Sequence, residues 1–549
     1  MSAAASVSIR GVGVKGSDVY TTTGDPRVDL NVKLVRGAAR EELQAGIDAV
    51  RAAGHLEDAI LMMFHARNVR GGKGERDVAA EMLRHLWSVA PEAIERVLPL
   101  WPQYGSWRDL FVLLADAGRV VPAQRRVLVD LAVAQLLTDR DSSGGVSLCA
   151  KWAPREHGAA ADRRVVQDLA RQLFPEVTTH SGQMRAYRKL VASLNRRAGT
   201  VETLMCAGRW ADIRPATVPG RAGMLYGKAF LNLPVRPEGR GSALRRPEDA
   251  DRMACREHFQ AYFKAAAEGR VRINGSATVF PHEIVRKAYR EEERLSTEER
   301  DQLTALWRAT IEAVGLGGNG LRRTVMMSDF SGSMQSSAAG DTPYWVSMAL
   351  GILGSQLQTG AFRGRMMTFD STPTWHTFPE GADLFGCLAT LRRSRIGQGL
   401  STNFEAAMQL VLSTLRDGGV PPGEEPENLL VLTDMGWDAA SGRSDGRLWE
   451  THVERLRAEF AAGGWRMPTI VIWNLAAQYS GDYHATADVP GVAMLSGWSA
   501  AQFRVLQREI RQLTALEVLR VELDDPRYDA VREALRQGEA EALRPAFTT

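Results

Sequence analysis

Residues 324–334 read TVMMSDFSGSM. The apolar first half of this stretch predicts a buried β-strand, and Asp329, Ser331 and Ser333 follow where that strand ends. A carboxylate and two hydroxyls at alternate positions can converge on one hard cation, because Mg²⁺ prefers oxygen ligands and seldom fills its coordination sphere from protein alone. The stretch therefore predicts an oxygen-rich cation site with a position open to a partner.

Strand-like and helix-like segments alternate from this stretch onward. They follow the glycine-rich segment 315–320, which predicts a linker. Such alternation is typical of an α/β domain with a doubly wound, Rossmann-like, largely parallel sheet, whose ligands bind at the carboxyl ends of the strands. We expect strands at 322–328, 365–369, 375–378, 428–434, 469–475 and 492–495, and helices at 343–359, 384–393, 404–416, 446–462 and 500–515.

Two later segments carry further oxygen ligands. Residues 397–404 read GQGLSTNF, a glycine-rich loop that offers Thr402 and enters a helix. Residues 428–434 form a buried apolar strand that ends in Asp434. The alternative is purely structural: the serines after Asp329 cap a turn, and Asp434 makes an Asx turn.

The order Asp-x-Ser-x-Ser, then Thr, then Asp resembles the metal-ion-dependent adhesion site (MIDAS) of the von Willebrand factor A (vWA) domain, over residues 321–520. The resemblance implies a site for Mg²⁺ or another divalent cation. It also implies that the hydroxyls bind directly, that the aspartates act partly through water, and that an acidic residue of a protein partner completes the sphere. The implied metal-site residues are Asp329, Ser331, Ser333, Thr402 and Asp434.

Residues 39–315 have a different pattern. Apolar residues recur there at three- and four-residue spacing between short Gly/Pro turns, which predicts many successive helices stacked in pairs as an all-α, HEAT-like solenoid or ring. No clean repeat period is visible, so any repeats are degenerate. We expect residues 1–38 to be irregular and residues 521–549 to be a C-terminal extension that packs on the rest.

Charge is distributed unevenly between the two parts. Residues 321–549 hold 21 Lys and Arg against 27 Asp and Glu, a formal charge of −6, and residues 1–320 carry +9. A basic excess suits a polyanionic ligand, although a solvated surface explains it equally well.

A first basic cluster surrounds Gly71-Gly72-Lys73-Gly74. A phosphate-binding P-loop needs Ser or Thr after the lysine and a strand before the loop, so nucleotide hydrolysis is not indicated. The basic side chains could instead hold RNA phosphate, or the segment could be an ordinary turn between helices. The residues concerned are Arg67, Arg70, Lys73 and Arg76.

A second basic cluster contains aromatic residues. Trp152 and Tyr187 lie near it in sequence, and interleaved basic and aromatic side chains suit RNA, although aromatic residues at helical spacing commonly belong to a core. The candidate RNA-binding residues here are Lys151, Arg155, Arg185, Arg188 and Lys189.

Several segments of the helical half, together with the vWA-like part, resemble the TROVE architecture of the Ro ribonucleoprotein family, and most of all an uncharacterised Ro-like family of bacteria and plants. The resemblance implies a helical ring, closed by the vWA domain, that binds structured or misfolded RNA. The segments that carry it are 63–77, 104–110, 150–156, 187–190, 209–214, 218–220 and 226–230.

No catalytic motif is visible. Together with the Ro resemblance and the metal set, this leads us to expect a non-enzymatic, Ro-like RNA-binding protein whose vWA domain binds a divalent cation. Neither a metalloprotease HExxH, nor a GxSxG elbow, nor a Cys/His signature occurs. The alternative is a metal-dependent protein–protein interaction scaffold without RNA, and a divalent-dependent nuclease is a third hypothesis. Four dispersed cysteines, no signal peptide and no long apolar run favour a reducing cytoplasm.

Overall fold

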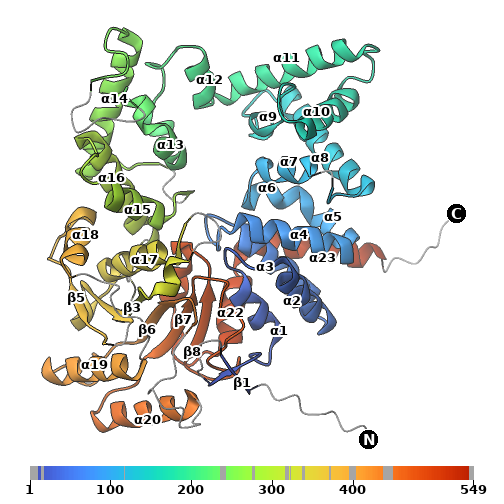
Figure 1. The fold of residues 1–549 in the computed structure, drawn as a ribbon. Coiled ribbons are helices and arrows are strands. Elements are labelled where there is room, and N and C mark those ends of the chain that lie inside the picture. Colours follow the sequence, from blue (N-terminus) through green and yellow to red (C-terminus); the bar gives the residue numbers. More distant parts are fainter. Residues whose placement is uncertain are drawn as a thin grey trace, which may run out of the picture.

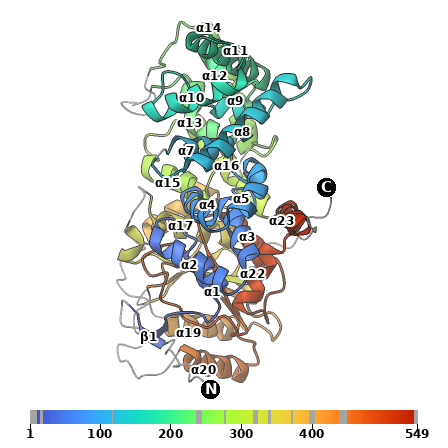
Figure 2. The same ribbon diagram turned by 90° about the vertical axis from the view of Figure 1, so that its right-hand side faces the viewer.

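The structure is a computed structural model that describes residues 10–13, 18–116, 118–234, 243–274, 278–315, 321, 323–336, 341–369, 372–394, 404–436 and 449–542. It has a helical N-terminal part and a C-terminal part built on a mixed, mostly parallel sheet. Figure 1 shows the helices as an arch: α2 to α11 rise on one side, α12 crosses, and α13 to α16 form the other side. Figure 2 shows the arch standing above the sheet.

The helices of the arch are mostly short, and turns join them. They are α1 Pro26–Lys33, α2 Arg40–Ala52, α3 Leu56–Arg67, α4 Arg76–Val89, α5 Pro91–Val97, α6 Trp101–Tyr104, α7 Trp107–Ala115, α8 Pro122–Asp141, α9 Cys149–Trp152, α10 Ala160–Leu173, α11 His180–Ala198, α12 Val201–Cys206, α13 Gly220–Phe230, α14 Ala250–Ala267, α15 Pro281–Glu291 and α16 Thr297–Gly315.

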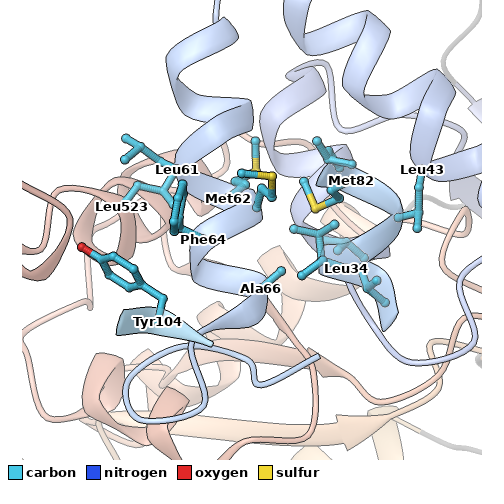
Figure 3. Packing of buried hydrophobic residues seen from close by; sticks show 14 of the residues in the cluster. Leu34, Leu43, Leu61, Met62, Phe64, Ala66, Met82, Tyr104 and Leu523 are labelled. Atoms are coloured by element: carbon cyan, nitrogen blue, oxygen red, sulfur yellow. The ribbon is translucent and has the colours of Figure 1, made fainter. Parts of the chain in front are cut away.

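Helix α3 is the centre of the N-terminal packing. Every residue from Asp58 to Arg67 is buried, as expected for a helix that is apolar on nearly all sides. Figure 3 shows Phe64 and Leu61 of α3 beside Leu523, which comes from the far C-terminal part of the chain. The arch and the C-terminal part therefore share one hydrophobic core.

The prediction of an irregular N-terminal segment is wrong for most of its described residues. Strands β1 Arg10–Val12 and β2 Asp18–Tyr20 pair antiparallel, and α1 follows them. Asp25 caps α1 by accepting a hydrogen bond from Arg27 N at 2.8 Å, and Pro26 occupies the first helical position, where its fixed φ is favourable. This short capped helix had no apolar periodicity long enough to be recognised.

The sheet has the strand order β5-β4-β3-β6-β7-β8, and only β5 runs antiparallel to its neighbour. Its central strands are buried on both faces, which explains their continuous apolar sequences. The topological switch lies between β3 and β6, whose carboxyl ends are therefore adjacent. The strands are β3 Thr324–Asp329, β4 Arg365–Phe369, β5 Trp375–Thr377, β6 Asn428–Thr433, β7 Thr469–Asn474 and β8 Val492–Ser496.

One predicted helix of this part was wrong. Residues 500–514 contain only a 3₁₀ turn and the four-residue helix α21. Thr514 and Glu517 then form a capping box that starts a new helix at Ala515. Helix α23, the most C-terminal helix, packs against α3 and α5 of the arch. The helices are α17 Pro343–Leu357, α18 Leu384–Arg393, α19 Phe404–Asp417, α20 Trp449–Ala462, α21 Phe503–Leu506, α22 Ala515–Leu523 and α23 Asp529–Ala542.

Both ends of the arch meet at Trp498, which follows β8. Its indole Nε1 donates to Leu475 O at 2.8 Å, and the ring is 2% exposed. Arg36, from the first end of the arch, lies 4.0 Å above this ring, and His282, from the second end, meets it edge-on at 5.0 Å. Trp498 thus holds both ends on the sheet domain.

Two further properties are the state of the cysteines and the apolar character of the helices. The four cysteines all lie in the described part of the chain and are free thiols. Among the helices that the structure describes, none combines the length and the apolar character needed to cross a bilayer.

Candidate cation site and nucleic-acid interface

Asp329, Ser331 and Ser333 lie together at the end of β3. Asp329 Oδ1 accepts from Ser331 N at 2.8 Å, an Asx-type turn that folds the chain back over the strand end. The two serine hydroxyl oxygens are 3.1 Å apart. Asp329 and Ser331 are buried, and Ser333 is partly exposed, so the cluster has one side towards solvent.

Asp434 comes to the same edge on the adjacent strand. Thr433, the last residue of β6, donates from Oγ1 to Asp329 Oδ2 at 3.1 Å and so links the two strand ends. Asp434 Oδ1 accepts from Gly436 N at 3.0 Å, which is the Asx turn weighed as an alternative. This turn engages one oxygen and is compatible with a cation role for the carboxylate.

The next residue is strained. Met435 has φ +69°, a left-handed conformation that costs a non-glycine residue about 1–3 kcal/mol and is often found at functional sites. The buried His484 holds it in place, since Nε2 of the ring donates to Met435 O at 3.0 Å. Burial lowers the pKa of His484 to about 4, so the ring is neutral and the carbonyl fixes its tautomer.

The electrostatics of the cluster suit a cation. Burial and the nearby Asp434 carboxylate raise the pKa of Asp329, because two like charges lie together away from water. A divalent cation would remove this repulsion, and carboxylates with hydroxyls are the donor set of Mg²⁺. Thr402 lies outside the described residues, and within the described part no group of three His, Cys, Asp or Glu side chains is arranged to hold a metal.

The four residues of the first basic cluster do not form a continuous basic surface. Lys73 is 0% exposed, and its Nζ donates to Asn31 O at 2.9 Å and to Ser496 Oγ. Arg67 is buried in an ion pair with Asp109 at 2.7 Å. Arg70 and Arg76 remain exposed, beside Gln103 O and Asp77 respectively. The prediction that Lys73 and Arg67 hold RNA phosphate is therefore corrected, since both are used to join parts of the chain.

Lys73 should make the stability depend on pH. Burial lowers its pKa from 10.5 to about 8, against the opposing effect of Glu522 and Glu75. Between pH 8 and pH 10.5, Lys73 is protonated in the unfolded chain and deprotonated in the folded chain. The free energy of unfolding therefore rises with pH across this range. We expect the unfolding free energy of the wild type, relative to Lys73→Met, to increase across this window in urea titrations. The exposed Lys189→Met variant should run parallel to the wild type, and parallel curves for Lys73→Met would contradict this assignment.

The second basic cluster lies on α9 and α11, far from the first in both ribbon views (Figures 1 and 2). Lys151 pairs with Glu202 at 3.2 Å, and Arg155 donates to Ala153 O at 3.1 Å. Trp152 is half-buried, with the Arg108 guanidinium 5.4 Å and the Lys151 ammonium 5.6 Å from its ring. Tyr187 is a core residue, because it is buried and donates to Pro154 O at 2.9 Å.

Helix α11 carries the strongest local charge. Its sequence HSGQMRAYRKLVASLNRRA has five Lys and Arg residues and no acid. Arg188 pairs with Glu156, and Arg197 donates to backbone carbonyls, among them Asp139 O at 2.8 Å. Arg185, Lys189 and Arg196 are exposed and make no ion pair within the described residues.

Three residues of these sites had no clear signal in the sequence. His484 lies between short turns, Arg108 and Trp152 lie on helices that the whole of α8 separates, and Arg196 lies seven residues beyond Lys189. Only the spacing of Arg196 from Lys189 along one helix could have identified it as part of the same face.

Comparisons with known proteins match the chain over most of its length. Residues 323–535 match a family described as a domain of unknown function, DUF7788. The chain is 26% identical over 512 residues to the uncharacterized protein L728 of Acanthamoeba polyphaga mimivirus, covering 88% of this chain and 82% of that protein. The crystal structure of the Deinococcus radiodurans Ro (RSR) protein superposes with a TM-score of 0.43 and 15% identity, over 89% of this chain and 99% of that chain.

Proposed function

We propose that this protein is a non-enzymatic RNA-binding protein whose arch holds RNA along α11 and whose sheet domain binds a divalent cation. The observation that carries the proposal is the exposed basic face of α11. Arg185, Lys189 and Arg196 are spaced by four and seven residues and therefore lie on one side of the helix. A row of cations that form no ion pair with the described residues favours a phosphate backbone, which dominates affinity for nucleic acid.

The surroundings of α11 support RNA over a simple anion. Arg188 and Arg197 anchor the helix to neighbouring segments, so the free cations stand on a fixed support. Trp152, on the adjacent α9, offers a half-buried ring between two cationic side chains. Such a ring can stack on an unpaired base.

The direct test is fluorescence anisotropy with the full chain and labelled RNAs, single-stranded and hairpin, across a salt series. We expect binding whose affinity falls steeply as salt rises, because counterions are released from the phosphates. Undetectable binding at low salt, or affinity that does not respond to salt, would reject the RNA function.

The cation site would use Asp329, Ser331, Ser333 and Asp434, with Thr402 as the remaining candidate ligand. We expect Mg²⁺ to raise the melting temperature of the wild type, because a ligand that binds only the folded state stabilises it. Asp329→Asn should remove this response, since it deletes one charge from the donor set while keeping the side-chain shape. Differential scanning fluorimetry with EDTA and a Mg²⁺ titration measures the shift.

The control for the cation site is Asp417→Asn, which changes an exposed carboxylate at the end of α19. It should keep the full response to Mg²⁺. A response that survives in Asp329→Asn would place the cation elsewhere. A protein partner that co-purifies only with Mg²⁺, in the absence of RNA binding, would instead support the scaffold hypothesis.

A further inference from the structure

A groove lies between the segment after α12 and one side of α14. Its cavity volume is about 640 Å³, against about 60 Å³ and 30 Å³ for two cavities near the junction of the arch with the sheet domain. Leu204, Arg209, Arg214, His258 and Tyr262 are among its lining residues. Sites for small organic ligands commonly have ~300–1,000 Å³, so the groove has room for a nucleotide unit.

The wall of the groove is held rigidly. The Asp251 carboxylate of α14 accepts from Trp210 N at 2.7 Å and from Ala211 N at 3.0 Å. The Arg252 guanidinium lies 3.7 Å from the centre of the Trp210 ring. These contacts fix the loop before any ligand arrives, which reduces the ordering cost of binding.

The side chains that face the groove combine cationic and flat apolar surface. Arg209 pairs with Asp212 at 2.6 Å, and both are more than half exposed, so this pair is weak and open to exchange. Arg214 and His258 are exposed and form no ion pair in the part of the chain described. The Tyr262 hydroxyl donates to Arg272 O at 3.1 Å, which holds the ring in place as one side of the groove.

The groove lies close to α11 along the chain, since only α12 separates them. Helix α12 follows α11 directly and lies between it and the other side of the arch (Figure 1). The segment that carries Arg209 and Arg214 follows α12. We propose that this groove holds a nucleotide of the RNA strand bound on α11, with Arg214 and His258 on the phosphate and Tyr262 against the base; the inference rests on the proposed function.

The experiment uses the full chain and a single-stranded oligouridylate that contains 4-thiouridine. Arg214→Glu should weaken binding about tenfold at roughly 0.1 M salt, since one phosphate contact is lost and a repulsion is added. Photo-crosslinked peptides identified by mass spectrometry should include Tyr262 in the wild type. Tyr262→Ala should lose this crosslink and Tyr262→Phe should keep it, because only the flat ring is needed.

The matched control is Arg457→Glu. Arg457 is exposed, and its helix α20 lies at the opposite end of the molecule from α11 (Figure 1). This variant should bind RNA as the wild type does. If replacing Arg185, Lys189 and Arg196 of α11 by glutamate lowers affinity while Arg214→Glu does not, and no crosslink falls within 204–262, the groove is not a nucleotide site but the proposed function stands. If the wild type binds no RNA, both fail. Circular dichroism of each variant separates misfolding from lost contacts.

Discussion

Replacing Arg185, Lys189 and Arg196 together by glutamate is expected to lower RNA affinity about 100-fold at roughly 0.1 M salt. Each phosphate contact on a single strand contributes about 0.7 to the slope of log affinity against log salt, so the slope should fall by about 2. All three side chains are exposed and make no ion pair in the described structure, so the fold should not change. Anisotropy titrations across the salt series measure both quantities.

Two controls make this result specific to α11. Arg457→Glu adds the same kind of charge change on α20, at the other end of the molecule in Figure 1, and should leave affinity nearly unchanged. Arg188→Glu would break an ion pair with Glu156 as well as change the charge, so it is a poorer probe. Equal loss in the α11 and α20 variants would mean that net charge, and not a site, controls binding.

Trp498→Ala is expected to cost about 3–5 kcal/mol of folding free energy, the usual range for removing a large buried aromatic side chain. The effect should also be local. Without the indole, Arg36 and His282 lose the ring that they share, and the two ends of the arch lose a common support. Amide hydrogen exchange should therefore increase most in α1 and α15, and urea denaturation gives the overall loss.

Trp498→Phe is the matched comparison. It keeps an aromatic ring between Arg36 and His282 but removes the hydrogen bond to Leu475 O, so it should cost about 0.5–1.5 kcal/mol. Exchange in α15 should stay close to that of the wild type. If the amide hydrogen exchange of α15 is the same in Trp498→Ala and in the wild type, other contacts are sufficient to hold the second end of the arch. One such contact is the ion pair of Arg286 with Asp341 at 2.8 Å.

One edge of the sheet carries both the proposed cation site and the attachment of the arch. The carboxyl ends of β3 and β6 carry Asp329 and Asp434, while those of β7 and β8 hold the first end of the arch. Asn474, at the end of β7, donates to Val32 O at 2.9 Å, and Ser496, at the end of β8, donates to Asn31 O. The proposed cation site and the attachment of the arch are thus neighbours on one sheet.

The sequence was sufficient to predict the strands of the sheet domain and to name candidate residues for the proposed cation site. All six strands of the sheet were predicted nearly to their ends. The strands buried on both faces read as continuous apolar runs, and Asp329 and Asp434 were placed at strand ends because polarity changes abruptly there. Helix ends depended on single capping contacts, such as Thr514 with Glu517, which periodicity does not show.

Which basic residues are available to a ligand depends on the folded structure. Lys73 and Lys189 are the same residue type in similarly basic segments, yet one is 0% exposed and donates to Asn31 O, whereas the other lies open on α11. The difference arises from partners distant in the chain: Ser496 and Glu522 come to Lys73 from the sheet domain. A sequence specifies the charge of a side chain, but burial and pairing depend on contacts between segments far apart, and those contacts exist only in the folded chain.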